Sequence, residues 1–181
     1  MDGYPHEFSG GMRQRVVIAL ALCAEPQLVI ADEPTTALDV SVQAQIIALL
    51  KNLTRRHGAA VMLITHDMGV IAETADRVAV MYAGRIAEIG EVRELIRDPL
   101  HPYTQGLMAA IPTLDIRADR LAQIPGAMPR LSAIPRGCAF APRCPQVFER
   151  CAERPPLIAV GDRRAACWLH DRAPAAADAR N

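Results

Sequence analysis

Two short groups of residues near the start of the chain could do phosphate chemistry. Ser9, Gly10 and Gly11 stand at the expected start of a helix, where a hydroxyl, exposed backbone N–H groups and the positive end of the helix dipole favour a phosphate. Asp32 and Glu33 directly follow a short apolar run. Asp32 is suited to binding Mg²⁺, and Glu33 to orienting or deprotonating an attacking water.

Two isolated polar residues extend this set. His66 follows the apolar run 60–64 and could donate a hydrogen bond to a terminal phosphate. Asp39 precedes a predicted helix, where its first role would be turn hydrogen bonding or a helix cap. Each signal also fits a structural role, because Ser-Gly-Gly is common in turns and a lone histidine after a strand is usually structural. The adjacent carboxylates favour function most, since they repel each other unless a cation or ligand compensates.

Four of the five cysteines lie among prolines and arginines toward the end of the chain, at Cys138, Cys144, Cys151 and Cys167. This grouping suggests one shared ligand site, for an iron–sulfur cluster or structural zinc. The wide spacing matches neither a zinc ribbon nor the usual ferredoxin run, so the residues alone leave the metal open. A cytosolic setting disfavours disulfides. Cys23 is expected to be buried in a helix and is interpreted as a small hydrophobe.

Two strands and two helices must position the candidate phosphate-binding residues, from Ser9 to His66. Residues 10–24 predict a helix that Ser9 caps and Pro26 stops, and its nearly all-round apolar surface predicts burial. The runs 28–31 and 60–64 predict strands covered on both faces, because neither run alternates with polar residues. A helix is predicted between them, which favours a right-handed crossover and a parallel pair.

Parallel strands joined in this way finish at one edge of the sheet. Ser41 can start the crossover helix and Gly58 can end it. Ligands of open α/β sheets bind at the carboxyl ends of the strands. We therefore expect Asp32, Glu33 and His66 to reach a common site despite their separation in sequence.

The amino-acid composition of the chain changes near residue 98. A hairpin is predicted over 78–89, followed by a short amphipathic helix from Glu91. Prolines then become frequent. We predict an α/β fold in residues 1–97, an irregular proline- and cysteine-rich extension in 98–171, and a frayed tail in 172–181.

Composition excludes several classes of function. Twenty basic residues balance twenty acidic ones in the 181-residue chain, so no overall field draws it to nucleic acid. The longest apolar run falls well short of the roughly 20 residues that a membrane-spanning helix needs. The first residues do not resemble a signal peptide, which makes cytoplasmic residence the default expectation.

The ordered motifs resemble the ATP-binding cassette (ABC) ATPases of membrane transporters, over residues 6 to about 90. The resemblance implies a signature motif at 9–14, a Walker B strand at 28–32, a catalytic carboxylate at Glu33, a D-loop at 37–39 and a switch histidine at His66. It also implies ATP and Mg²⁺ as ligands, with binding roles for Ser9, Gly10, Gly11, Gln14, Asp32 and Asp39. In this family two nucleotide domains pair head to tail, so each signature motif closes over ATP held by the other domain.

One expected motif is missing. A phosphate loop of the G-x-x-x-x-G-K-S/T type needs a lysine, and the only lysine is Lys51, inside a predicted helix. The phosphate loop and glutamine loop of such a domain are both absent. We therefore expect poor ATP binding by the chain alone, exposed edges of its core, and a truncated gene product or partial sequence.

The second part of the chain resembles one particular branch of this family. Residues 101–108 and 137–145 resemble the C-terminal extension of oligopeptide and dipeptide importer ATPases, a branch that also serves nickel. This resemblance implies a four-cysteine iron–sulfur site, expected as a 4Fe–4S cluster with Zn²⁺ as the alternative ligand. The ligands would be Cys138, Cys144, Cys151 and Cys167.

These expectations combine into a fragment of an importer's ATP-hydrolysing subunit, peripheral at the cytoplasmic face of the membrane. Its expected partners are a second nucleotide-binding subunit and transmembrane permease subunits, with no nucleic acid. One alternative is a catalytically inactive, metal-bound interaction module, which the missing phosphate loop favours. Another is a soluble ABC-type ATPase acting on nucleic acid or ribosomes, which the neutral charge disfavours.

Overall fold

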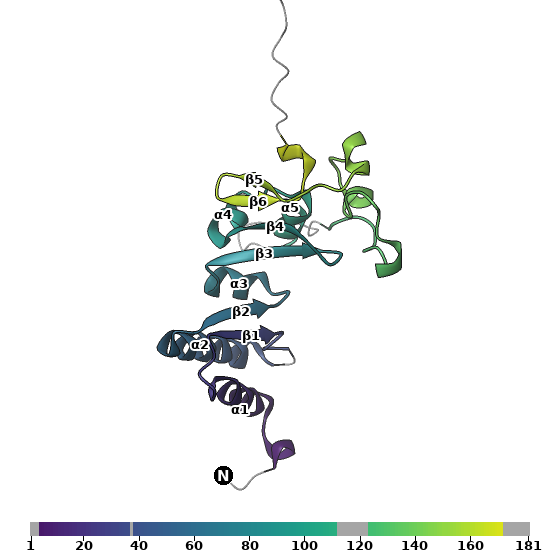
Figure 1. Cartoon of the computed structure of the whole chain (residues 1–181). Coiled ribbons are helices and arrows are strands. Elements are labelled where there is room, and N and C mark those ends of the chain that lie inside the picture. The colour runs from purple at the N-terminus through teal and green to yellow at the C-terminus, as the bar shows by residue number, and fades with distance from the viewer. Residues whose placement is uncertain (1–3, 37, 112–122, 172–181) are drawn as a thin grey trace, which may run out of the picture. The chain divides into compact units, whose positions relative to one another are not determined.

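The structure is a computed structural model that describes residues 4–36, 38–111 and 123–171 (Figure 1). The chain forms two compact units, Met1–Ala75 and Asp76–Asn181. The predicted boundary near residue 98 lies inside the second unit. The predicted tail at 172–181 and Ala37 of the predicted D-loop lie outside the described residues.

The first unit contains a parallel strand pair joined by a helix. Its elements are η1 (Pro5–Glu7), α1 (Gly10–Leu22), β1 (Leu28–Asp32), α2 (Val40–His57), β2 (Ala60–Ile64) and α3 (Met68–Thr74). β1 and β2 are parallel, in a register that pairs Leu28 with Ala60 and Asp32 with Ile64. The predicted α/β arrangement of parallel strands is confirmed, and Asp32 and Ile64 end their strands at the same edge.

The core of this unit lies between α1, α2 and one face of β1. Its buried members are Ile18, Leu22, Val29, Ile46 and Leu50. They come from the apolar stripe of α2, from one side of α1 and from alternate positions of β1, as helical and strand periodicity require.

The predicted all-round burial of α1 and two-sided burial of β1 and β2 are wrong in the described residues. Leu20 on α1 is 68% exposed and Ile30 on β1 is 61% exposed. Met62 on β2 is also exposed, at 50%. The apolar sequences of β1 and β2 are typical of strands buried on both faces, but only one face of β1 carries core residues. Apolar core edges are therefore exposed in the described residues.

The second unit is built on a four-stranded antiparallel sheet in the order β3-β4-β6-β5. Its main elements are β3 (Arg77–Tyr82), β4 (Arg85–Glu91), α4 (Val92–Arg97), α5 (Pro102–Ala109), β5 (Ile158–Val160) and β6 (Arg163–Ala165). Short segments of 3₁₀ helix, three or four residues long, lie in the remainder: η2 (Leu131–Ala133), η3 (Ala141–Arg143), η4 (Glu149–Ala152) and η5 (Trp168–His170).

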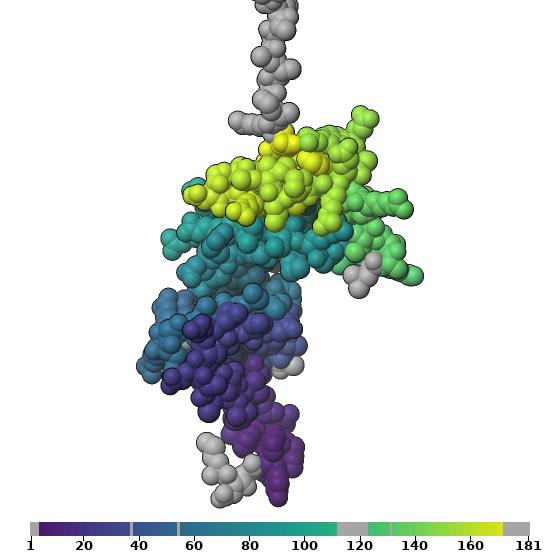
Figure 2. Space-filling model, in the orientation of Figure 1, coloured from purple at the N-terminus to yellow at the C-terminus, as the bar shows by residue number. Residues whose placement is uncertain are grey.

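The predicted hairpin is present as β3 and β4, and its turn residues Ala83 and Gly84 have φ of 48° and 75°. The β5–β6 hairpin was not predicted. β6 pairs with β4 through Glu88 and Ala165, so a late segment of the chain completes a sheet begun by an early one. In the space-filling view, the teal and yellow-green segments of this unit pack together (Figure 2).

A buried polar network holds the second unit together. The Glu88 carboxylate, fully buried, accepts hydrogen bonds from the backbone N–H groups of Leu100 (3.0 Å) and His101 (2.9 Å). The His101 ring, 3% exposed, accepts from Tyr103 N at 3.0 Å and thereby caps α5. His170 Nε2 lies 2.9 Å from the Leu100 carbonyl oxygen. These contacts satisfy buried backbone groups that would otherwise destabilise the fold.

None of the helices among the described residues combines the length and apolar character needed to cross a bilayer.

Candidate functional site

Glu33 and His66 meet where β1 and β2 end. The backbone N–H of Glu33 donates to the Ile64 carbonyl at 2.8 Å, which continues the strand pairing by one residue. The Glu33 Oε1 and His66 Nδ1 atoms lie 2.8 Å apart. The structure therefore brings together the two residues that the strand-end argument placed at a common edge. Asp32, the last residue of β1, is exposed at the same edge.

The local geometry of Glu33 is unusual. Its φ of 45° lies in the left-handed region, which a glutamate adopts only where the surroundings enforce it. The Thr36 hydroxyl donates to Glu33 Oε2 at 3.1 Å and occupies the second carboxylate oxygen. Thr36 was not singled out from the sequence. Its position three residues after the carboxylate, in a turn, is the signal that could have found it.

The pair is open to solvent, and each side chain shifts the pKa of the other. The hydrogen bond from His66 lowers the pKa of Glu33, and the same bond raises the pKa of His66. The Glu33 and His66 side chains are 38% and 85% exposed. Nδ1 is occupied by Glu33, so the pair can present a carboxylate to water and the remaining ring nitrogen to an anion.

The loop that carries His66 is tied to the crossover helix. Asp67 caps α3 by accepting from the backbone N–H of Gly69 at 2.9 Å, and its other oxygen accepts from Gln43 Nε2 at 2.8 Å. Sequence reasoning missed both residues. The signal for Asp67 was an acidic residue directly before a helical segment, which is a common N-cap pattern.

The signature segment forms a separate site at the start of α1. The Ser9 hydroxyl accepts from Met12 N at 3.4 Å, so Ser9 caps the helix as predicted. A Cβ on Gly10 would lie 3.0 Å from Leu38, and a Cβ on Gly11 would lie 2.7 Å from Val42. The two glycines thus allow α1 to approach the loop before α2 and the first turn of α2 closely, a packing role that adds to the predicted phosphate role.

A cavity of about 240 Å³ opens beside this segment, lined in part by Ser9, Gly10, Gly11 and Asp39. Asp39 Oδ1 also accepts from Val42 N at 2.9 Å, the helix-capping role expected from its position. Gln14 is half-buried on α1 and does not line the cavity. Neither Glu33 nor His66 lines it, so the described residues divide the predicted nucleotide groups into two sites.

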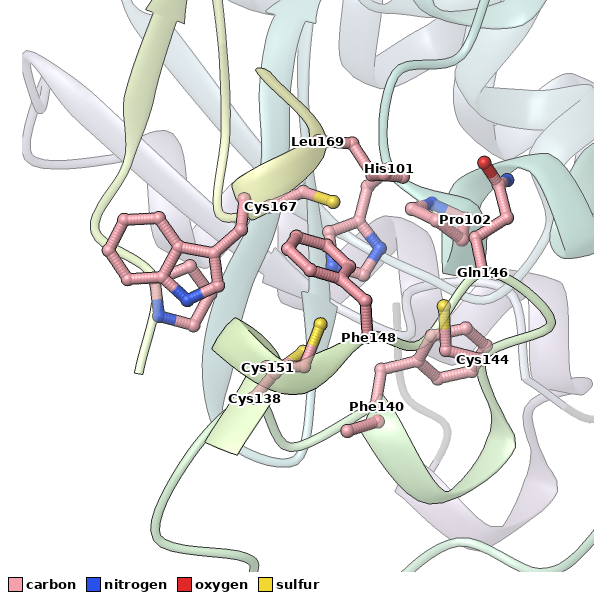
Figure 3. Close-up of a pocket in the computed structure, with 13 residues that line it drawn as sticks. His101, Pro102, Cys138, Phe140, Cys144, Gln146, Phe148, Cys151, Cys167 and Leu169 are labelled. Carbon is pink, nitrogen blue, oxygen red and sulfur yellow. The ribbon is translucent and has the colours of Figure 1, made fainter. Parts of the chain in front are cut away.

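The four late cysteines line one cavity in the second unit, together with His101, Phe140 and Phe148 (Figure 3). All four are free thiols, and they range from partly buried to buried. Burial raises the pKa of Cys138 and Cys144, and it raises the pKa of Cys167 to about 11. These thiols therefore stay protonated at neutral pH unless a cation draws off their protons.

The predicted 4Fe–4S or Zn²⁺ site is not supported as a preformed ligand set. Among the described residues, no three His, Cys, Asp or Glu side chains are grouped to hold a metal ion. In Figure 3 the Phe148 ring projects between the sulfur of Cys167 and that of Cys151. The four thiols line one cavity, but aromatic side chains line it with them.

Two family models match the chain. Residues 1–36 match the ABC transporter family, and residues 87–151 match the C-terminal region of the oligopeptide/dipeptide transporter family. The first match covers the signature segment and Glu33. The second covers β4, α5 and three of the four cysteines.

Curated relatives extend these matches over most of the chain. The oligopeptide transport ATP-binding protein OppD of Salmonella typhimurium is 54% identical over 164 residues, which cover 91% of this chain and 49% of OppD. The dipeptide transport ATP-binding protein DppD of Bacillus subtilis is 52% identical over 171 residues, covering 93% of this chain and 51% of DppD. The chain thus spans about half the length of the curated relatives it matches.

Among solved structures, the ATP-binding cassette MJ0796, in a dimeric post-hydrolysis state bound to ADP and Pi, is 36% identical, with a TM-score of 0.45. That match covers 51% of this chain and 39% of the MJ0796 chain. With both family models and relatives of about 50% identity in agreement, the chain belongs to the ABC transporter ATP-binding proteins of the oligopeptide/dipeptide branch, and it corresponds to a C-terminal part of them.

Proposed function

We propose that this chain is part of an ATP-hydrolysing subunit that energises the import of oligopeptides or dipeptides. The observation that carries the proposal is the 2.8 Å pair of Glu33 and His66 at the shared end of β1 and β2. The printed functions of the relatives, oligopeptide and dipeptide transport, support the substrate class.

In this role Glu33 orients the attacking water and accepts its proton. The bond to His66 lowers the pKa of Glu33, which keeps the carboxylate ionised and able to accept a hydrogen bond from the water that it orients. His66, held through Nδ1, donates from its other ring nitrogen to the anionic phosphoryl group. Asp32 offers an exposed carboxylate to Mg²⁺, which is the ligand type that this ion prefers. ATP with Mg²⁺ supplies the phosphoryl group.

The separation of the two sites supports a partnership with a second nucleotide-binding subunit. Ser9 and Asp39 line a cavity that Glu33 does not share. A head-to-tail pair would use the signature cavity of one subunit and the carboxylate of the other on the same ATP. Permease subunits, and a peripheral position on the cytoplasmic face of the membrane, complete the proposal. We propose no nucleic-acid partner, because the net charge is zero.

The test is a chimera in which this chain follows the half of Salmonella OppD that it does not match. Glu33→Gln in the chimera should retain ATP binding and lower turnover by about 10²–10⁴-fold, the usual contribution of a positioned acid–base group. Glu25→Gln is the matched control, because Glu25 is an exposed glutamate with φ of 47°. Equal turnover in the Glu33→Gln chimera and its parent would overturn the assignment.

We also propose that the four cysteines bind an iron–sulfur cluster once the cavity opens. Their placement around one cavity supports this proposal. After anaerobic purification, visible absorbance with matching iron and sulfide contents is the expected result. Stoichiometric zinc without iron would favour the zinc alternative, and the absence of both metals would leave the thiols without a metal role.

A further inference from the structure

Two of the four cysteines are connected through their backbones. The N–H of Cys138 donates to the carbonyl of Cys151 at 3.0 Å, which fastens the segment before η3 to η4. The crossing is tight: a Cβ on Gly137 would lie 2.5 Å from the carbonyl oxygens of Cys151 and Ala152. This hydrogen bond and the tight crossing bring the main chains into contact at the two cysteines, and a disulfide requires such closely spaced main chains.

Both side chains also line the same cavity. Figure 3 shows the sulfur atoms of Cys138 and Cys151 next to one another on the same side of the cavity. Both residues are half-buried, so a small oxidant can reach them.

We propose that Cys138 and Cys151 are a redox-active dithiol that closes to a disulfide in the metal-free protein. The assignment goes beyond ATP hydrolysis and does not depend on it. Where the cysteines bind a cluster, the disulfide and the cluster compete for the same two sulfurs, so oxidation of the pair blocks loading.

Oxidised glutathione can act as the oxidant. The Cys151 thiolate attacks one glutathione sulfur, which forms a mixed disulfide and releases one glutathione thiolate. The Cys138 thiol then loses its proton and attacks the Cys151 sulfur, which forms the internal disulfide and releases the second glutathione thiolate to take up a proton. The two cysteines lose two protons and two electrons, and one oxidised glutathione becomes two reduced molecules.

Peptide mapping tests the pairing directly. The metal-free chain is incubated with oxidised glutathione, alkylated, and digested with trypsin without reduction. Cleavage after arginine places the four cysteines on four separate peptides: 137–143, 144–150, 151–163 and 165–172. We expect a loss of two of the five thiols and a cross-linked peptide that joins 137–143 to 151–163.

Two variants test which cysteines form the disulfide. Cys151→Ser should abolish the cross-linked peptide and leave Cys138 as a mixed disulfide with glutathione or as a free thiol. Cys144→Ser, the matched control on the same cavity, should leave the cross-link intact. Cross-links that join Cys144 or Cys167 instead, a statistical mixture of pairings, or retention of all five thiols would each overturn the proposal.

Discussion

The two units hold their chemically important groups in opposite ways. In the first unit, Glu33 and His66 contact each other at strand ends, with side chains 38% and 85% exposed. In the second, Glu88 and His101 are 0% and 3% exposed and bond to buried backbone. We therefore expect a substitution at Glu33 to impair catalysis with little effect on folding. A substitution near the cysteine cavity should mainly lower the stability of the fold.

The largest expected effect on stability is at the chain crossing beside Cys138. Gly137→Ala should lower the free energy of unfolding by about 3 kcal/mol, because the new Cβ meets backbone atoms at 2.5 Å. The measurement is urea unfolding followed by the fluorescence of Trp168, the only tryptophan. Gly161→Ala is the control: its φ of 60° costs about 1 kcal/mol, but open space surrounds it. Equal losses would show that the crossing is not tight.

The second effect is acid sensitivity. Burial first, and then the charge of His170, lower the pKa of His101 to about 4, while the unfolded histidine keeps a pKa of about 6.5. Between these values the unfolded state binds the extra proton. Stability should therefore fall as the pH drops from 6.5 to 4, by up to about 1.4 kcal/mol per pH unit.

The same Trp168 fluorescence, measured in urea at several pH values, checks this slope. His101→Asn keeps a side-chain acceptor for capping α5 and removes the titrating ring, so it should flatten the slope between pH 4 and 6.5. A wild-type slope no steeper than that of His101→Asn would contradict the buried neutral histidine.

A smaller effect is expected on the outer side of the cavity. The Arg150 guanidinium lies 3.8 Å from the centroid of the Trp168 ring and pairs with Asp171. Arg150→Met should lower stability by about 1 kcal/mol and shift the emission of Trp168. Arg154→Met, at an exposed arginine nearby in sequence, should do neither. Identical emission spectra for both variants would refute the stacked geometry.

The smallest expected effect is on the pKa of His66 in the first unit. His66 should titrate above the usual pKa of about 6.5, and Glu33→Gln should return it to that value. The stabilisation from the raised pKa is present below about pH 6.5 and is lost as the pH rises through the His66 pKa. NMR titration of the ring protons measures both values. A His66 pKa that does not respond to Glu33→Gln would break the proposed pair.

Local patterns in the sequence predicted much of the first unit. The apolar stripe of α2, the Ser9 cap and the strand runs were sufficient to place Glu33 and His66 at one edge. Burial was predicted poorly, because an apolar run such as that of α1 reports what an element can pack against, and not what is present to cover it. The β5–β6 hairpin escaped prediction because its strands are only three residues long.

Sequence by itself determined the family, the element types of the first unit and the grouping of the cysteines. Only the tertiary structure decided that Glu88 pairs with Ala165 in the sheet, that Cys138 is fastened to Cys151, and that an aromatic ring stands among the thiols. The physical reason is how far apart in sequence the contacting residues lie. Caps, periodicity and strand ends depend on neighbouring residues, whereas these contacts join segments far apart in the chain, and they form only when the whole unit packs.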